Sequence, residues 1–304
     1  AEYPQHVCDL VSPQSLSREG KYTVKLYDYS KGVTIPVVVD DRLPCPPQDN
    51  FIAFERPTYE GNVKTVILGK PVFAQVTQDG EIWPCIVEKA VAKLAGSYEK
   101  LNIASATFAF GMLTGCTDLL NISKAANGKW VLRRPKFESP SFWDPANKSV
   151  RIPWTFPIFG SMYDFDARLY EEWPDGARGK NDSEMLRALA DFKDQDYLVC
   201  VATSRELFKA AQESTGLLSG HEYALLSVKL DVANSGLSMV QLRNPHGWGY
   251  EAWMGDWSDK SDLWEKNPEV KNALGFKEEN DGVFWMDAVG FLERFRHVCV
   301  CCKP

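Results

Sequence analysis

A histidine and an asparagine occupy positions in this sequence from which they could act together in catalysis. His221 opens the segment 221–230, and Asn244 closes the segment 239–244 just before Pro245. An imidazole can take a proton from a thiol, and a side-chain amide oxygen can accept the other imidazole N–H and orient the ring. Each residue alone is more often structural, either a histidine among apolar residues or a turn at Asn-Pro. Together they predict two members of a Cys-His-Asn triad.

The third member would be a cysteine, and the sequence contains eight of them. Several lie inside apolar segments, as Cys85 does in WPCIVEKA and Cys200 in YLVCVAT. This pattern is typical of reduced, buried thiols in an intracellular protein, so we expect a cytoplasmic protein. The one cluster, Cys299, Cys301 and Cys302, lacks the C-x-x-C spacing of a zinc site. We therefore expect a buried edge strand there rather than a metal site.

The composition limits the classes of partner. The 304 residues carry a net charge of −7, and 44% of them are hydrophobic. Nucleic-acid binding favours a basic face, so the acidic balance argues against such a partner. The longest apolar runs have the length of strands, so no membrane span is expected. No secretory signal is visible at the start, and because Ala1 is not an initiator methionine we expect a processed or shortened chain.

Two strands and two helices are expected in the first part of the chain. Residues 22–29 and 35–41 have the alternation of strands. Apolar residues recur at helical spacing over 83–101, and a second helix is expected over 106–113. Gly115 would end that second helix.

The pattern changes further along the chain. The segment 129–180 is rich in proline, tryptophan, phenylalanine and charge without clear periodicity, so we expect a long, partly ordered insertion. After it, strands predominate. We expect helices over 181–192, where Asn181 or Asp182 is the cap, 205–214 and 287–295, and strands over 196–203, 221–230, 239–244, 283–286 and 297–302. An α-rich first part and a β-rich second part predict an α+β architecture with the site between two lobes.

Five longer segments resemble the protease core of the calpains, in the family's order and at compatible spacings. They are VVVDDRLPC, WPCIVEKAVAKLAGSYEKL, LSGHEYALL, QLRNPHGWGYEAWMGDWSD and DGVFWMDAVGFLERF. The resemblance implies a papain-like, two-lobed fold, with an α-rich lobe over 1–115 and a β-rich lobe over 116–304 that holds the insertion. It also implies a cysteine endopeptidase that hydrolyses peptide bonds in protein substrates, with regulatory domains flanking the core.

In the calpains the first lobe supplies the nucleophilic cysteine, and His221 and Asn244 match the two residues that the second lobe supplies. The family's cysteine lies in a Gly-x-Cys-Trp motif upstream of DDRLP, and this sequence contains no Cys-Trp pair. Cys8 is the only cysteine before DDRLP, but it lacks the glycine, the tryptophan and a helix N-terminus to favour a thiolate. A glutamine that helps bind the oxyanion also has no counterpart. We therefore expect that Ala1 lies just beyond the catalytic helix and that this chain alone is inactive.

A second departure from the family follows Asn244. The calpains carry tryptophan directly after the Asn-Pro pair, and His246 takes that place here. We expect His246 to be an exposed loop residue and Trp248 to take over the shielding of the site.

Calpain cores bind two calcium ions, one in each lobe, and calcium takes six to eight oxygen ligands. Glu251, Asp259 and Asp281 match ligand positions of the second lobe, and Glu88 matches one of the first. Val283 stands where the family has a glutamate, so one carboxylate is lost. The resemblance therefore implies weak Ca²⁺ binding, and we expect no other cofactor.

Three functions stay open from the sequence. The first is the calpain-like endopeptidase. The second is a non-catalytic calpain-like module for interaction or regulation; the two departures from the family favour it, and retention of His221 and Asn244 argues against it. The third, a lysosomal papain-type protease, would need secretion features and disulfides, and neither is evident.

Overall fold

The computed structural model describes most of the chain as two compact units. The first is built from residues of Ala1–Ala104, Met112–Gly115 and Ser139–Met162, and the second from Ser105–Gly111, Cys116–Glu138 and Tyr163–Pro304. The described residues are 3–28, 31–45, 51–57, 63–69, 71, 74, 76, 80–101, 106–133, 143–144, 149–150, 173, 175–204, 215–245, 253–279 and 281–302.

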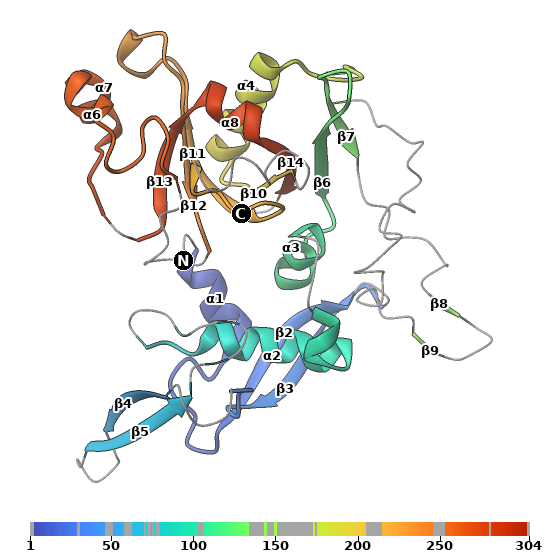
Figure 1. The fold of residues 1–304 in the computed structure, drawn as a ribbon. Coiled ribbons are helices and arrows are strands. Elements are labelled where there is room, and N and C mark those ends of the chain that lie inside the picture. Colours follow the sequence, from blue (N-terminus) through green and yellow to red (C-terminus); the bar gives the residue numbers. More distant parts are fainter. Residues whose placement is uncertain are drawn as a thin grey trace. The chain divides into compact units, whose positions relative to one another are not determined.

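An antiparallel sheet and one helix form the core of the first unit. The strands are β1 (Val11–Ser12), β2 (Lys21–Asp28) and β3 (Val33–Asp40), in that order across the sheet. Alternate side chains of β2 and β3 are buried with the apolar face of α2 (Trp83–Ala95). Figure 1 shows α2 lying across these strands. The two strands and the long helix predicted for this region are confirmed.

The predicted helix 83–101 is divided into two elements. Gly96 has φ of 97° and ends α2 in a left-handed conformation that glycine adopts at low cost. A short 3-10 helix follows. Other elements had no clear signal in the sequence, and they are α1 (Pro4–Leu10), β4 (Phe51–Pro57) paired with β5 (Val63–Gly69), η1 (Tyr98–Leu101), and β8 (Trp143–Asp144) paired with β9 (Ser149–Val150).

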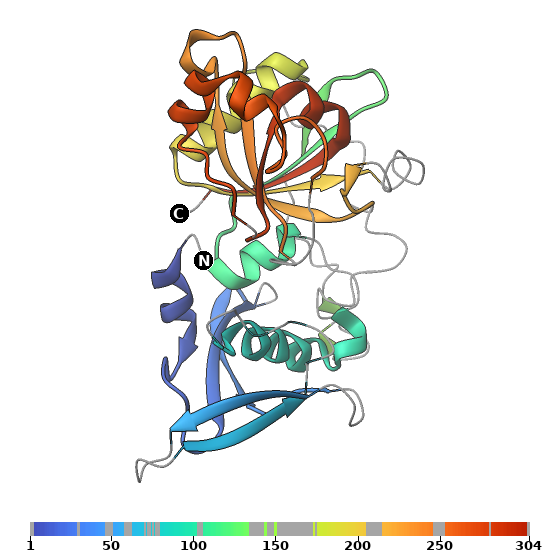
Figure 2. The same cartoon turned by 60° about the vertical axis from the view of Figure 1, so that its left-hand side comes forward.

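A seven-stranded antiparallel sheet forms the centre of the second unit (Figure 2). Its strand order is β13-β12-β11-β10-β14-β6-β7. The strands are β6 (Leu119–Lys124), β7 (Trp130–Arg133), β10 (Leu198–Thr203), β11 (Glu222–Lys229), β12 (Met239–Arg243), β13 (Val283–Asp287) and β14 (Phe295–Cys301). The strands predicted from residue 196 onward are confirmed, so the unit has the strand-rich character that the sequence indicates.

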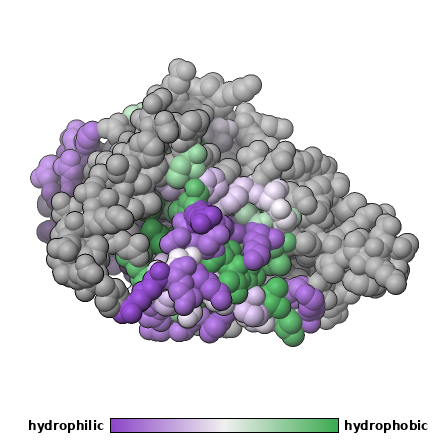
Figure 3. All heavy atoms as spheres, turned by 90° about the horizontal axis from the view of Figure 1, so that it is seen from below, coloured by the Kyte–Doolittle hydropathy of each residue, from purple (hydrophilic) through white to green (hydrophobic). Residues whose placement is uncertain are grey.

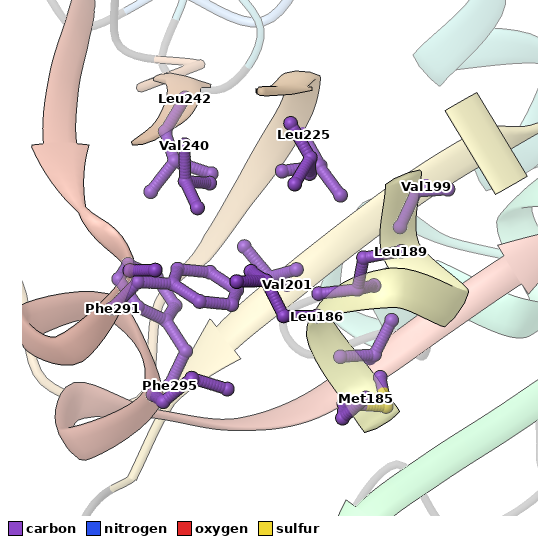
Figure 4. Close-up of a cluster of buried hydrophobic side chains, with 14 of the residues drawn as sticks. Met185, Leu186, Leu189, Val199, Val201, Leu225, Val240, Leu242, Phe291 and Phe295 are labelled. Atoms are coloured by element: carbon purple, nitrogen blue, oxygen red, sulfur yellow. The ribbon is translucent and has the colours of Figure 1, made fainter. Parts of the chain in front are cut away.

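Helices cover the sheet and complete the second unit. Figure 4 shows the side chains of α4 and α8 gathered with those of β10, β11 and β12 in one buried cluster. A smaller tryptophan-rich cluster includes residues of α6, α7, β12 and β13. The helices are α4 (Asp182–Asp194), η4 (Val232–Asn234), α6 (Leu263–Lys266), α7 (Pro268–Leu274) and α8 (Ala288–Arg294). A further helix, α3 (Ala106–Thr114), is divided between the units, because its residues up to Gly111 belong to the second and those from Met112 to the first. The predicted helices 106–113, 181–192 and 287–295 are confirmed, and 205–214 lies outside the described residues.

One prediction about the sheet is wrong. The cysteine-rich segment at the C-terminal end was expected to be an edge strand, but β14 lies between β10 and β6 and pairs with both. The reason is that both faces of β14 are buried: Val298, Val300 and Phe295 pack in the main core, whereas Cys299 and Cys301 are buried on the opposite face. An apolar run without alternation is typical of such a central strand.

The described ends of the predicted insertion belong to the sheet unit. Trp130 and Lys180 exchange two backbone hydrogen bonds of 2.8 and 2.9 Å. The two ends of the predicted insertion are therefore neighbours. Trp130 is fully buried, and Trp173 is almost so. Most of the segment between them lies outside the described residues.

Among the described helices, none combines the length and the apolar composition that crossing a membrane requires.

Candidate active site

The register of two strands places His221 and Asn244 next to each other in the second unit. β11 begins directly after His221, and β12 ends directly before Asn244. The two strands are antiparallel, with Ala224 opposite Arg243, so the start of one lies beside the end of the other. Side chains far apart in the sequence therefore meet at one end of this strand pair.

The His221 and Asn244 side chains are hydrogen-bonded to each other. His221 Nε2 lies 3.1 Å from Asn244 Oδ1, so the predicted contact between these side chains is confirmed. An amide oxygen only accepts, so Nε2 must carry the hydrogen and donate it. In a neutral imidazole the other nitrogen, Nδ1, is then free of a proton and able to accept one.

Asn244 is held rigidly behind the histidine. Its side chain belongs to a residue that is only 1% exposed, and its backbone N–H donates to the Gly282 carbonyl at 2.9 Å. Burial excludes water from competing for Oδ1, so the hydrogen bond to His221 stays the favoured arrangement. Asn244 therefore has the surroundings of an orienting residue for an imidazole.

Two residues that the sequence analysis did not single out hold His221 from the other side. The Thr203 hydroxyl accepts a hydrogen bond of 3.1 Å from the His221 backbone N–H. The Tyr223 ring meets the imidazole edge to face, with ring centroids 4.9 Å apart. The one signal available in the sequence was the position of Tyr223, two residues after the histidine and so on the same face of the strand.

Four of the cysteines, Cys8, Cys85, Cys200 and Cys299, do not have the surroundings that favour a nucleophilic thiolate. None of the eight cysteines forms a disulfide. Burial raises the pKa of Cys85 to about 11 and that of Cys299 to about 12, and burial together with the Glu222 carboxylate raises the pKa of Cys200. Cys8 lies in the second half of α1 rather than at a helix N-terminus, where a thiolate would be favoured.

Two of the four predicted calcium ligands lie close together in the second unit. Burial and the nearby carboxylates of Asp281 and Glu278 raise the pKa of Asp259 to about 6. Asp281 is engaged already, because its Oδ1 accepts a hydrogen bond of 2.9 Å from the Val283 backbone N–H. Val283 itself contributes no side-chain oxygen.

The other two predicted ligands do not join this pair. Glu88 lies on α2 in the first unit, where its carboxylate accepts a hydrogen bond of 2.9 Å from the Ala74 N–H and burial raises its pKa. Glu251 lies outside the described residues, as do His246 and Trp248. Within the described ranges no three His, Cys, Asp or Glu side chains are grouped as metal ligands. These side chains alone do not fit the oxygen shell that Ca²⁺ needs.

A separate pocket of about 580 Å³ lies in the first unit beside β3 and the C-terminal end of α2. Three of its charged side chains, those of Asp40, Lys89 and Lys93, are already bonded within the unit. Lys89 bonds the Asp40 carboxylate and the Arg42 carbonyl, and Lys93 donates to the Val38 carbonyl at 2.7 Å. Seen from below, hydrophilic and hydrophobic side chains of the described residues are interleaved rather than gathered in one apolar patch (Figure 3). This pocket lacks the histidine and asparagine of the candidate site.

Comparison with known proteins connects this geometry with one family. Residues 1–133 and 158–302 match the family described as calpain family cysteine protease. The chain is 29% identical to the calpain-type cysteine protease DEK1 of Arabidopsis thaliana over 297 residues, which are 97% of this chain and 10% of that protein. It is 25% identical to calpain clp-1 of Caenorhabditis elegans over 286 residues, 93% of this chain and 26% of that protein.

A human relative, calpain-14, is 25% identical over 301 residues, 98% of this chain and 32% of that protein. The chain therefore spans between about a tenth and a third of the length of these relatives.

Proposed function

Because this chain belongs to the calpain family of cysteine proteases, we propose that it is the core of a cysteine endopeptidase in which His221 is the catalytic base and Asn244 orients it. The hydrogen bond of 3.1 Å between His221 Nε2 and Asn244 Oδ1 carries this proposal. The substrates would be protein chains. The lobes would extend over residues 1–115 and 116–304, and further domains would flank the core in the longer protein, as the length of the relatives suggests.

The geometry supports a definite division of roles between the two imidazole nitrogens. Nε2 donates to Asn244 and stays protonated throughout. Nδ1 would take the thiol proton of the nucleophile and later give it to the leaving amine, since one group serves as base and then as acid. The amide of Asn244 is uncharged, so it orients the ring without the strong stabilisation of imidazolium that a carboxylate would give.

The nucleophile would come from a segment outside these 304 residues. The sequence has no Cys-Trp pair, and the raised pKa values of Cys85, Cys200 and Cys299 disfavour the thiolate that attack requires. In the acylation step the thiolate would attack the peptide carbonyl carbon, the C–N bond would break, and the amine would leave with the proton from His221. Water would then hydrolyse the thioester.

The test compares two proteins. Residues 1–304 alone should not hydrolyse a fluorogenic peptide or casein, whereas the protein extended to include the residues encoded before Ala1 should do so. Iodoacetamide and His221→Ala should each abolish the activity of the longer protein. Iodoacetamide-sensitive cleavage by residues 1–304 alone would instead identify one of the eight cysteines as the nucleophile, and Cys8→Ser would then be the next variant.

The coding sequence before Ala1 distinguishes this function from a non-catalytic module. A glutamine followed by Gly-x-Cys-Trp supports the enzyme. Serine, glycine or aspartate at the position of that cysteine supports an interaction or regulatory module built on the same fold. A cytoplasmic location is part of the proposal and would be tested by imaging the full-length protein.

A further inference from the structure

The loop before His221 is fixed at two points by buried side chains. It runs from Leu218 to His221 and passes through Gly220, whose φ is 60°. Thr203 ends the neighbouring strand β10 and is 2% exposed, and Tyr223 is fully buried beneath the loop. Both belong to the same compact unit as the loop.

Thr203 holds both ends of this loop through one hydroxyl group. Its Oγ1 donates to the Leu218 carbonyl at 2.7 Å and accepts from the His221 backbone N–H at 3.1 Å. Its backbone N–H also donates to the His221 carbonyl at 3.1 Å. Both the N–H and the C=O of His221 are therefore bonded to one residue of the adjacent strand.

Tyr223 provides the second fixed point. Its phenolic oxygen accepts a hydrogen bond of 2.9 Å from the Leu218 N–H. Its ring also packs edge to face against the imidazole. The two phenylalanines of the core, Phe284 and Phe295, hold the Tyr223 ring in turn by edge-to-face contacts with centroids 5.9 and 5.6 Å apart.

We propose that Thr203 is the positioning residue for His221, and that with Tyr223 it sets the orientation in which the imidazole meets Asn244. The physical reason is that His221 directly follows Gly220, a residue type with wide backbone freedom. The Thr203 hydroxyl holds the His221 N–H on the Gly220 side, while the Thr203 backbone N–H holds the His221 carbonyl on the strand side. A displacement of about 1 Å at a reacting group can lower a rate by about 100-fold. Fixing the backbone of the base therefore matters for the rate of reaction as well as for stability.

This inference rests on the proposed role of His221, but its test needs no nucleophile. Imidazole nitrogen spectra of residues 1–304, recorded at about pH 8, report which ring nitrogen of His221 carries the hydrogen. The wild-type ring should be present almost entirely as the Nε2–H form, because that form donates to Asn244. Thr203→Val, which keeps the shape but removes the hydroxyl, should lower the ratio of the Nε2–H to the Nδ1–H form about fivefold, the change that loss of one hydrogen bond produces.

Two matched variants separate positioning from general stability. Thr203→Ser keeps the hydroxyl and should restore the wild-type ratio. Thr107→Val removes another buried hydroxyl of the same unit, one that donates to Cys299 Sγ at 3.2 Å, and should leave the His221 signals unchanged. An unchanged ratio in Thr203→Val, or an equal change in Thr107→Val, would overturn the proposal.

Two further measurements test the proposal even if the Thr203→Val protein does not fold. Tyr223→Phe loses the acceptor for the Leu218 N–H and should shift the same ratio in the same direction by a smaller amount. In the wild-type chain the amides of Leu218 and His221 should be protected from hydrogen exchange, because each donates to a buried oxygen. Exchange at the rate of an unstructured peptide would contradict the proposal without any variant.

The Asn244→Ala variant separates a failure of this proposal from a failure of the proposed function. If this variant leaves the His221 tautomer unchanged, the pairing on which the proposed function rests has failed. The Thr203→Val result is still read by itself, since it reports whether the hydroxyl controls the ring.

Discussion

At the scale of single residues, the candidate site depends on a neutral pair. Asn244 has no charge, and it is buried with its oxygen turned toward His221 Nε2. The pair therefore fixes a tautomer rather than a charge state, and its contribution is geometric. Removing it should affect the chemical step more than the binding of substrate.

Asn244→Ala should lower kcat of the longer, active protein about 10- to 100-fold with KM changed less than about threefold, because the base loses its orientation and not its proton affinity. Steady-state kinetics with a fluorogenic peptide measures both constants. Asn272→Ala, at an exposed position of α7, is the matched control. A loss confined to KM would show that Asn244 contacts substrate instead.

The raised pKa of Asp259 leads to a separate prediction about how the stability of the protein depends on pH. Its pKa in the folded protein is about 6, against an ordinary value of 3.8, because burial and the neighbouring carboxylates disfavour its charge. The folded state therefore binds this proton more tightly than the unfolded state. The stability that the protonated group contributes is complete below about pH 4 and is lost as the pH rises through about 6.

Asp259→Asn should therefore stabilise the protein at pH 7.5 by about 1 kcal/mol, since the full pKa difference is worth about 3 kcal/mol and solvent screens this half-buried side chain. This gain in stability over the wild-type protein should disappear at about pH 4, where Asp259 is protonated in the folded state. Urea unfolding of both proteins at the two pH values measures the difference, and Asp191→Asn, at an exposed position of α4, is the control. Equal stability at pH 7.5 would mean that a cation or a conformational change relieves the repulsion.

At the scale of elements, strand register and helix caps decide where the site residues lie. A slip of one residue between β11 and β12 would turn Leu225 and Leu242 out of the core, so burial fixes the register that also pairs His221 with Asn244. The helix α4 that covers this sheet begins with a capping box, in which Asn181 accepts from the Glu184 N–H and Glu184 accepts from the Asn181 N–H.

Asn181→Ala should destabilise the second unit by about 1 kcal/mol, because it leaves the Glu184 N–H without its acceptor at the first turn of α4. The midpoint of urea unfolding, followed by tryptophan fluorescence, measures the change. Asn181→Asp keeps an oxygen acceptor and a charge that suits a helix N-terminus, so it should retain wild-type stability. A loss as large in Asn181→Asp as in Asn181→Ala would contradict the capping argument.

At the scale of the whole molecule, the excess of negative charge bears on the affinity for Ca²⁺. The chain has a net charge of −7, and Asp259, Asp281 and Glu278 place negative charges near one another. A divalent cation would relieve that repulsion. However, Val283 has no side-chain oxygen at the position where the resemblance implies a carboxylate, and affinity in calcium loops follows the number of charged ligands.

Titration calorimetry of the folded chain should therefore detect Ca²⁺ binding only in the weak range, about 10⁻⁴ to 10⁻³ M, and the activity of the longer protein should depend on calcium weakly or not at all. Asp259→Ala is the control. Low-micromolar binding that the control abolishes would show that other oxygens replace the lost carboxylate.

The sequence by itself determined the family, the α+β class, most long elements and the identity of the histidine and asparagine. It could do so because these depend on local patterns: apolar alternation in β2, helical spacing in α2, and the strand ends beside His221 and Asn244. Only the tertiary structure decided which strands are neighbours and which side chains hold the backbone and ring of His221. The central place of β14 and the hydroxyl of Thr203 are examples, because both arise from pairing between segments that are distant in the sequence. Such pairing is set by burial of both sheet faces together, which no single segment encodes.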